Sequence, residues 1–134
     1  MFEELRPDAC LALLRTQNLG RLAVSRPGAA PYVVPVNYSV LRHSIVFRTT
    51  PGTKLDLVVT EPVSFEVDHY DDEAEIGWSV VVEGLAYEAS DREMEYEDVV
   101  VDSAAEQQNS RWVRLMPDLV TGRRVVRAVP QWRG

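Results

Sequence analysis

Residues 20–48, GRLAVSRPGAAPYVVPVNYSVLRHSIVFR, carry the clearest signal of the fold class of this chain. The stretch contains three short runs, at residues 21–24, 32–40 and 44–48, that alternate polar with apolar positions or are rich in β-branched and aromatic residues. Turn-forming residues such as Pro27-Gly28 separate the runs. The stretch therefore predicts a three-stranded antiparallel meander with short connections.

Strand signals recur in the second half of the chain. Residues 63–68 carry apolar side chains at every second position. Residues 78–87 form a longer run, in which Gly84 predicts a bulge or bend. Two more strands are expected at residues 111–115 and, after a break at Pro117-Asp118, at residues 119–129. The total is six or seven strands.

Short helices are expected beside these strands. Pro7 suits the first turn of a helix that would stop near residues 18–20, and residues 54–59 are predicted to form a second helix. Ser90 is a candidate N-cap for an acidic, mostly helical segment at residues 91–110. Because strands outnumber helices and consecutive strands are close enough to pair antiparallel, the pattern predicts a mainly β fold. Its best architecture is a partly open β-barrel with peripheral helices.

Length and composition fit one soluble domain at residues 1–134. The net charge of −7 disfavours binding to nucleic acid or to an anionic membrane surface. No apolar run approaches the roughly 20 residues that span a bilayer, and the first residues lack the order of a signal peptide, so a cytoplasmic location is expected. The single cysteine, Cys10, excludes an intramolecular disulfide and is expected to pack as a small apolar residue.

The sequence contains none of the common catalytic motifs. Signatures of serine hydrolases, zinc proteases, phosphate-binding loops and dinucleotide-binding folds are all missing. Both histidines, His43 and His69, fall in or beside predicted loops, and the acidic residues 71–75 lack the spacing of a calcium loop. We therefore predict no catalytic residue and no metal ligand, and an enzyme of this kind would depend on a cofactor for its reactivity.

The strongest local feature is FRTTPGTKL at residues 47–55. Arg48 lies at the end of a predicted strand, and Lys54 lies at the start of a predicted helix. Three residues with hydroxyl side chains lie between these two cations: Thr49, Thr50 and Thr53. Two cations, hydroxyl donors and the N–H groups of a helix start are what a phosphate binds. The alternative is a turn in which Thr53 caps the following helix.

Three stretches together resemble the pyridoxamine 5′-phosphate oxidase-like flavoproteins, the split-barrel flavin-binding superfamily, and in particular its small actinobacterial branch. They are GRLAV with PYVVPVNY at residues 20–38, IVFRT with GTKL at residues 45–55, and GWSVVVEG at residues 77–84 followed by WVRLMP and TGRR at residues 112–124. The resemblance implies a six-stranded antiparallel split β-barrel of the FMN-binding type. It also implies a homodimer with two flavins at the subunit interface.

The resemblance also implies a role for each matched position. Arg48, Thr49 and Lys54 would hold the FMN phosphate. The isoalloxazine ring would be lined by Val34, Pro35, Val36 and Asn37, partly through backbone groups. Ser79 would supply a polar contact to the flavin, and Trp112 and Arg123 lie in the region that completes the partner's site in relatives. Trp112 is also a candidate, with Trp132 and Val125-Val126, for the dimer surface, the alternative being that the tryptophans fill the barrel.

Two departures argue against oxidation of vitamin B6. The C-terminal residues 127–134 contain no histidine, and Val34 stands where the biosynthetic oxidase has an arginine. The expected function is therefore an FMN-binding oxidoreductase that exchanges hydride with a nicotinamide donor or another small-molecule substrate. A deazaflavin-dependent reductase is an alternative, although the acidic net charge favours FMN over a cofactor with an acidic tail. The chain could also be a flavin-binding or flavin-sequestering protein without turnover, or a barrel that has lost its cofactor and serves as a dimeric interaction domain.

Overall fold

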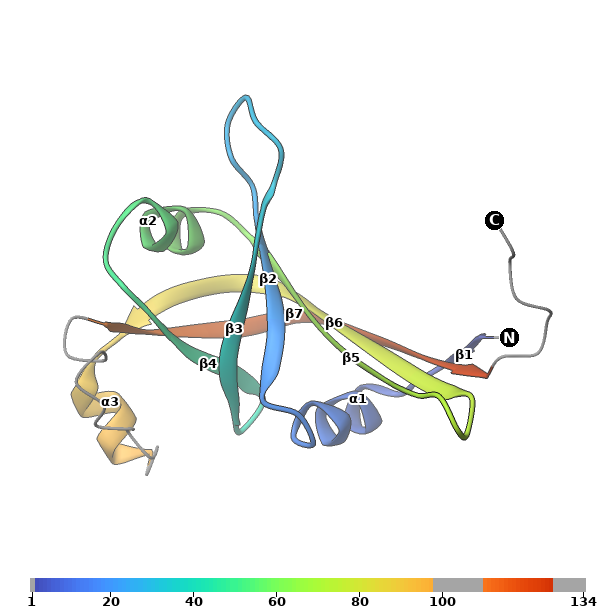
Figure 1. Cartoon of the computed structure of the whole chain (residues 1–134). Coiled ribbons are helices and arrows are strands. Elements are labelled where there is room, and N and C mark those ends of the chain that lie inside the picture. Colours follow the sequence, from blue (N-terminus) through green and yellow to red (C-terminus); the bar gives the residue numbers. More distant parts are fainter. Residues whose placement is uncertain (1, 98–109, 127–134) are drawn as a thin grey trace.

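The computed structural model describes residues 2–97 and 110–126, which form a β-barrel with peripheral helices (Figure 1). In chain order the elements are β1 (Phe2–Glu4), α1 (Pro7–Leu14), β2 (Leu19–Val24), β3 (Tyr32–Leu41), β4 (Ser44–Thr49), α2 (Thr53–Thr60), β5 (Val63–Asp71), β6 (Ile76–Ala89), α3 (Asp91–Tyr96) and β7 (Arg111–Val126). None of the described helices has the length and hydropathy needed to traverse a bilayer.

Six antiparallel strands close the barrel. They follow one another in the order β7-β4-β3-β2-β5-β6, and β6 pairs again with β7. The β6–β7 ladder is the longest, running from Ile76↔Val126 to Ala89↔Trp112, and β1 pairs with the end of β7. The mainly β, six-stranded antiparallel fold is confirmed. The hydrogen-bonded ring is closed, however, and this corrects the expectation of a partly open barrel, because a sequence pattern does not reveal which two strands meet last.

Alternating side chains fill the barrel. Successive residues of a strand point to opposite faces, so Ile45 and Phe47 of β4 enter the core while their neighbours face outward. The ring of Tyr38 meets that of Phe65 edge-on at 5.0 Å, and the Tyr38 hydroxyl donates to the carbonyl of Leu14 at 2.5 Å. Burial raises the Tyr38 pKa to about 12, so this hydroxyl stays protonated and keeps α1 attached to the barrel.

A second apolar cluster lies outside the barrel, beneath α3. It consists of Val46, Ala89, Met94 and Trp112. The predicted N-cap of this helix is confirmed, because the Ser90 Oγ accepts a hydrogen bond from the Glu93 N–H at 3.0 Å. The helix covers only the start of the segment expected to be helical, and residues 98–109 lie outside the described residues.

The sequence prediction differs from the structure at α1, β7 and β1, among other element ends. The first helix ends at Leu14, not near residues 18–20, because Leu19 and Gly20 already pair with Asn37 and Val36. Strand β7 is continuous through Pro117-Asp118, where a break was expected. The three-residue β1 was missed, since a strand that short shows no periodicity.

The irregularity expected at Gly84 is confirmed. The register between β6 and β7 shifts at Glu83/Gly84, opposite Pro117. A Cβ atom at Gly84 would lie 2.1 Å from the Met116 carbonyl oxygen, so only glycine allows this close approach. The bulge also explains why β7 tolerates a proline that has no N–H to donate.

Candidate functional site

The end of β4 and the start of α2 form one edge of the candidate site. Thr49 is buried, and its Oγ1 has no hydrogen-bond partner among the described residues. Four positions further along, α2 begins after Gly52, which has a φ of 146°. The N-cap residue is therefore Gly52, which has no side chain to cap the helix, and not Thr53, the cap expected if the segment were only a turn. An uncapped helix start with a buried hydroxyl beside it suits an anion.

Two side chains of the predicted phosphate motif, those of Thr53 and Lys54, lie outside the described part of the structure. Their backbone forms the first turn of α2. Thr50 lies between β4 and α2 and is exposed. Thr49 ends β4, Thr50 follows it, and α2 begins at Thr53, so these residues are within four positions of one another in the sequence.

Arg48 and Thr49 point to opposite faces of β4. Arg48 is paired across the ladder with Trp112, and its guanidinium carbon lies 4.5 Å from the centre of the indole ring. The Arg48 Nε also donates to the Ser110 Oγ at 2.5 Å. The Trp112 Nε1 is buried without a hydrogen-bond partner among the described residues. Arg48 therefore contacts Trp112 on the outer face of the barrel. Thr49 is two positions from the core residue Phe47, so its side chain lies on the inner face of β4.

Part of β3 has an unpaired edge beside this site. The β3–β4 ladder begins at Tyr38↔Phe47, so the described ladders give residues 34–37 a partner on the β2 side only. Val34 and Val36 pack with the barrel core, and Pro35 and Asn37 are exposed. Here β3 and the end of β4 have separated, so backbone groups of residues 34–37 are available to a ligand.

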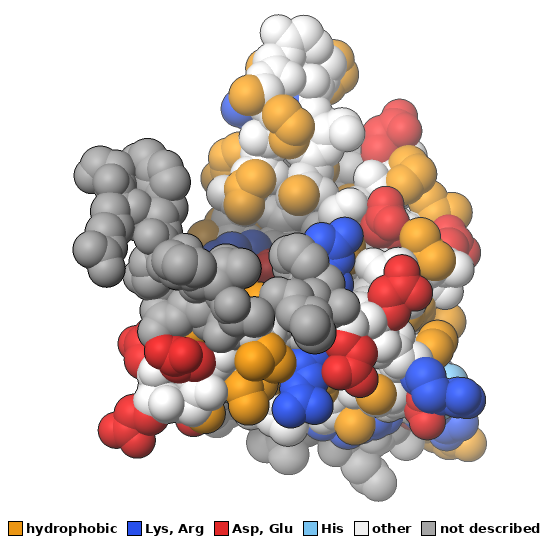
Figure 2. All heavy atoms as spheres, turned by 90° about the vertical axis from the view of Figure 1, so that its right-hand side faces the viewer, with side chains coloured by type: hydrophobic (Ala, Val, Ile, Leu, Met, Phe, Trp, Pro, Cys, Tyr) orange, Lys and Arg blue, Asp and Glu red, His pale blue; other side chains and the backbone are white. Residues whose placement is uncertain are grey.

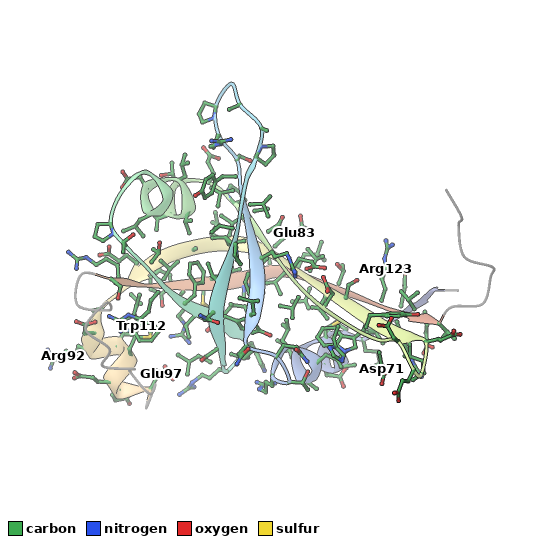
Figure 3. The ribbon with its side chains drawn as sticks, in the orientation of Figure 1. Asp71, Glu83, Arg92, Glu97, Trp112 and Arg123 are labelled. Atoms are coloured by element: carbon green, nitrogen blue, oxygen red, sulfur yellow. The ribbon has the colours of Figure 1, made fainter. Side chains whose placement is uncertain are left out.

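Within one chain, Ser79 and Arg123 lie away from the predicted flavin-site residues of β3, β4 and α2. They are cross-strand neighbours on β6 and β7. Trp112 and Arg123 are eleven positions apart on β7, a contour length of about 36 Å at ~3.3 Å per residue. In Figure 3, Trp112 lies near α3 and Arg123 lies toward the opposite end of β7. Arg123 and Glu83 project from the same side of this part of the sheet (Figure 3).

A charged cluster on the outer face of β2 and β5 was not predicted from the sequence. The Arg21 Nη1 lies 3.8 Å from the Glu66 Oε1 and 3.7 Å from the Asp68 Oδ2. Burial, followed by the hydrogen bond and negative charge of Asp68, raises the Glu66 pKa to about 7, and Arg21 opposes the shift. The alternation Glu66-Val67-Asp68 was the available signal, but the sequence does not show that Arg21 lies opposite.

A second network that was not predicted surrounds Arg114, a buried charged residue within a strand. Its Nε donates to the Ser44 Oγ at 2.8 Å and its Nη1 donates to the Glu93 Oε2 at 2.8 Å. The Tyr87 hydroxyl donates to the same carboxylate at 2.6 Å, and this bond, with that from Arg114, lowers the Glu93 pKa. The network fixes α3 to the barrel.

The two histidines lie outside these clusters. His43 lies in the β3–β4 turn, and His69 is exposed on β5. No group of three or more His, Cys, Asp or Glu side chains in the described ranges is arranged to hold a metal ion.

Comparison with known proteins identifies the family. The family model of pyridoxamine 5′-phosphate oxidase matches residues 6–124. The chain belongs to this family. An uncharacterised protein of Mycobacterium tuberculosis, Rv0080, is a relative with 34% identity, over 92% of this chain and 85% of its own length.

Two solved structures share the fold of this family member. The FAD-binding protein of Mycobacterium smegmatis is 32% identical, with a TM-score of 0.74 over 93% of this chain and 99% of that chain. An FAD-binding protein of Mesorhizobium loti is 25% identical, with a TM-score of 0.78 over 92% of this chain and 96% of that chain. Both cover almost the whole barrel.

Proposed function

We propose that this family member binds a flavin nucleotide where β3, β4 and α2 meet, and that it is a flavin-dependent oxidoreductase. The observation that carries the proposal is the buried Oγ1 of Thr49, which lacks a hydrogen-bond partner among the described residues and lies next to an uncapped helix start. Buried polar atoms without partners are rare in proteins, and an anion at this position would satisfy the hydroxyl. Similarity to the two FAD-binding proteins, from Mycobacterium smegmatis and Mesorhizobium loti, supports a flavin as that anion.

The residues present fit the parts of FMN. Thr49, the first N–H groups of α2 and Lys54 would hold the phosphate. The unpaired edge of β3 at residues 34–37 would face the isoalloxazine ring with backbone donors and acceptors. When bound, FMN supplies the hydride-accepting ring. The chain itself binds the ring, orients it and limits its contact with water.

FMN is the proposed form of the cofactor. FAD shares the riboflavin phosphate and would occupy the same anion site, with its adenosine portion extending beyond it. A deazaflavin coenzyme with an acidic tail fits less well, because the chain carries a net charge of −7. Because the two similar structures are FAD-binding proteins, FAD is the first competitor to test.

A homodimer would complete the site. Ser79 and Arg123 lie too far along the sheet to reach a flavin held by the Thr49 of their own chain, so a second copy would have to supply them. Exposed apolar side chains on β2, β3 and β7 suit such a contact: Leu19, Val33 and Leu119 are 49%, 60% and 51% exposed. Figure 2 shows hydrophobic side chains gathered on the projecting β2–β3 hairpin. A group of exposed apolar side chains such as that on the hairpin is typical of an interaction surface.

The test is a titration of the purified full-length protein with FMN, FAD, riboflavin and a deazaflavin coenzyme, followed by absorbance and fluorescence. FMN is expected to bind more tightly than riboflavin, because riboflavin lacks the phosphate. Stopped-flow mixing of the complex with NADH or NADPH then measures reduction of the ring. Binding without reduction by any donor tried would favour the sequestering alternative, and no binding of any of the four compounds would overturn the proposal.

A further inference from the structure

A cavity of about 370 Å³ lies between α1, the β3–β4 turn and β7. Its walls include Leu11 of α1, the turn residues Arg42, His43 and Ser44, and Arg114 and Val120 of β7. The volume falls within the ~300–1,000 Å³ typical of small-molecule sites. None of the described residues that line this cavity carries a carboxylate, although the chain as a whole is acidic.

Both guanidinium groups that line the cavity are paired with carboxylates of the α3 region. The Arg114 Nη1 donates a hydrogen bond to Glu93 and lies 3.8 Å from the Glu97 Oε1, and the Arg42 Nε lies 3.1 Å from the Glu97 Oε2. The Arg114 Nη2, and both terminal nitrogens of Arg42, make no hydrogen bond among the described residues. Since a guanidinium has five N–H donors, each arginine keeps donors for a further acceptor. In Figure 3, Glu97 lies beside α3.

The turn that carries Arg42 is fixed in position. Arg42 has a φ of 59°, a left-handed conformation that is uncommon outside glycine. The Arg15 Nη2 donates to the Arg42 carbonyl at 2.7 Å, and the Ser44 Oγ donates to the Leu41 carbonyl at 2.7 Å. The backbone of this turn is therefore arranged before any ligand arrives, and this lowers the entropic cost of binding.

We propose that this cavity binds a small organic carboxylate with an apolar body. The carboxylate would accept hydrogen bonds from Arg42 and Arg114, since the planar guanidinium fork matches a carboxylate. The apolar body would lie against Leu11, Met116 and Val120.

The site is separate from the proposed flavin site. Ser44 and Thr49 occupy opposite ends of β4, about 17 Å apart at ~3.3 Å per residue. Val120 packs against the barrel core, whereas Arg123 is exposed on the other face of β7. Ligand binding in this cavity can therefore be tested without a flavin.

The experiment is an NMR titration of the full-length ¹⁵N-labelled protein with phenylacetate. We expect chemical-shift changes at the amides of residues 42–44 and a dissociation constant that can be fitted. Acetate has the charge without the apolar body, and 2-phenylethanol has the body without the charge; each should bind at least ten-fold more weakly. Shift changes confined to residues elsewhere, or equal affinities for all three compounds, would overturn the proposal.

Two variants locate the binding site. Arg42→Gln removes an exposed cation and should weaken phenylacetate about ten-fold. Met116→Trp places a larger side chain at a half-exposed lining position and should weaken phenylacetate and 2-phenylethanol alike. Arg26→Gln, in the β2–β3 hairpin, is the matched control and should leave the affinity unchanged. Unfolding midpoints show that each variant is folded, and wild-type affinity in both cavity variants would place the ligand elsewhere.

Discussion

A Cβ atom at Gly122 of β7 would lie 2.4 Å from the Sγ of Cys10 in α1. Cys10 is fully buried, and Leu5 contributes further atoms at 3.3 Å. Helix α1 therefore packs directly on the backbone of β7 at Gly122. A side chain at this position would overlap Cys10. This contact explains why the lone cysteine is a packing residue, as the sequence predicted.

Gly122→Ala is therefore expected to destabilise the fold by about 1–3 kcal/mol, because the added methyl overpacks the helix–sheet contact. Urea unfolding measures the loss. Cys10→Ala in the same chain removes the opposing sulfur and should restore part of the stability, so the two effects would not add. Full additivity in the double variant would show that the two residues do not meet.

Glu66 should make stability depend on pH. Its raised pKa means that the folded state keeps a proton that the unfolded state releases between about pH 4.5 and 7. Stability should therefore fall as pH rises through this window, and not further above it. Because the side chain is one-third exposed, we expect a loss of about 1 kcal/mol after solvent screening.

Urea unfolding at pH 5 and pH 8 tests the role of Glu66. Glu66→Gln should abolish most of the difference between the two values, and Glu73→Gln in the exposed β5–β6 turn should retain it. An unchanged difference in Glu66→Gln would assign the pH dependence to another group.

The pair of buried Arg114 and half-buried Glu93 should matter more for stability than an exposed pair. Glu93→Gln takes the nearer carboxylate from a largely buried guanidinium, and Glu97 remains 3.8 Å away, so we expect a loss of about 2 kcal/mol. Glu88→Gln breaks the half-exposed pair with Arg111, whose atoms are 3.9 Å apart, and should cost less than about 1 kcal/mol. Thermal unfolding of both variants gives the comparison, and equal losses would contradict it.

The phosphate assignment predicts a selective loss of FMN binding. Lys54→Ala should weaken FMN roughly ten- to hundred-fold, since a hydrogen bond to a charged group contributes about 1.5–3 kcal/mol. Riboflavin should be nearly indifferent to the substitution. Fluorescence titration of both ligands separates the phosphate contact from damage to the fold, and parallel weakening of the two would reject it. Lys54→Arg should bind better than Lys54→Ala without full recovery.

Arg48→Ala tests the second predicted cation. Its contacts with Trp112 and Ser110 make Arg48 a candidate for holding the outer face together as well as for binding phosphate. If Arg48 binds the phosphate, Arg48→Ala weakens FMN and spares riboflavin, as Lys54→Ala does. If it only positions Trp112, both ligands are affected alike and the indole fluorescence changes without ligand.

Self-association is expected through the exposed apolar residues of β2, β3 and β7. Sedimentation at micromolar concentration should give twice the monomer mass. Val33→Glu and Leu119→Glu introduce charges on exposed apolar positions and should shift the protein toward the monomer, whereas Tyr96→Glu on α3 should not. A single monomeric species in the unaltered protein would refute the dimer.

Much of the barrel could be predicted because strand periodicity is local. The meander of β2, β3 and β4 and the bulge at Gly84 follow from alternation and from glycine placement, which neighbouring residues alone reveal. The end of α1 could not be predicted in this way. Leu19 and Gly20 look like a helix stop, but the ladder with β3 recruits them into a strand.

For the candidate site, too, the sequence predicted the local features and the tertiary structure decided the contacts between strands. Local sequence predicts hydroxyl and cationic residues along the segment between β4 and α2, since those residues are adjacent in the chain; their grouping around a phosphate stays a prediction. Three relationships emerged only from the folded chain: Arg48 faces Trp112 while Thr49 lies on the opposite face, Ser79 and Arg123 meet each other far from Trp112, and Arg114 is buried against Glu93. Such relationships depend on strand register, and register is fixed by how the whole barrel closes, which no local stretch of sequence specifies.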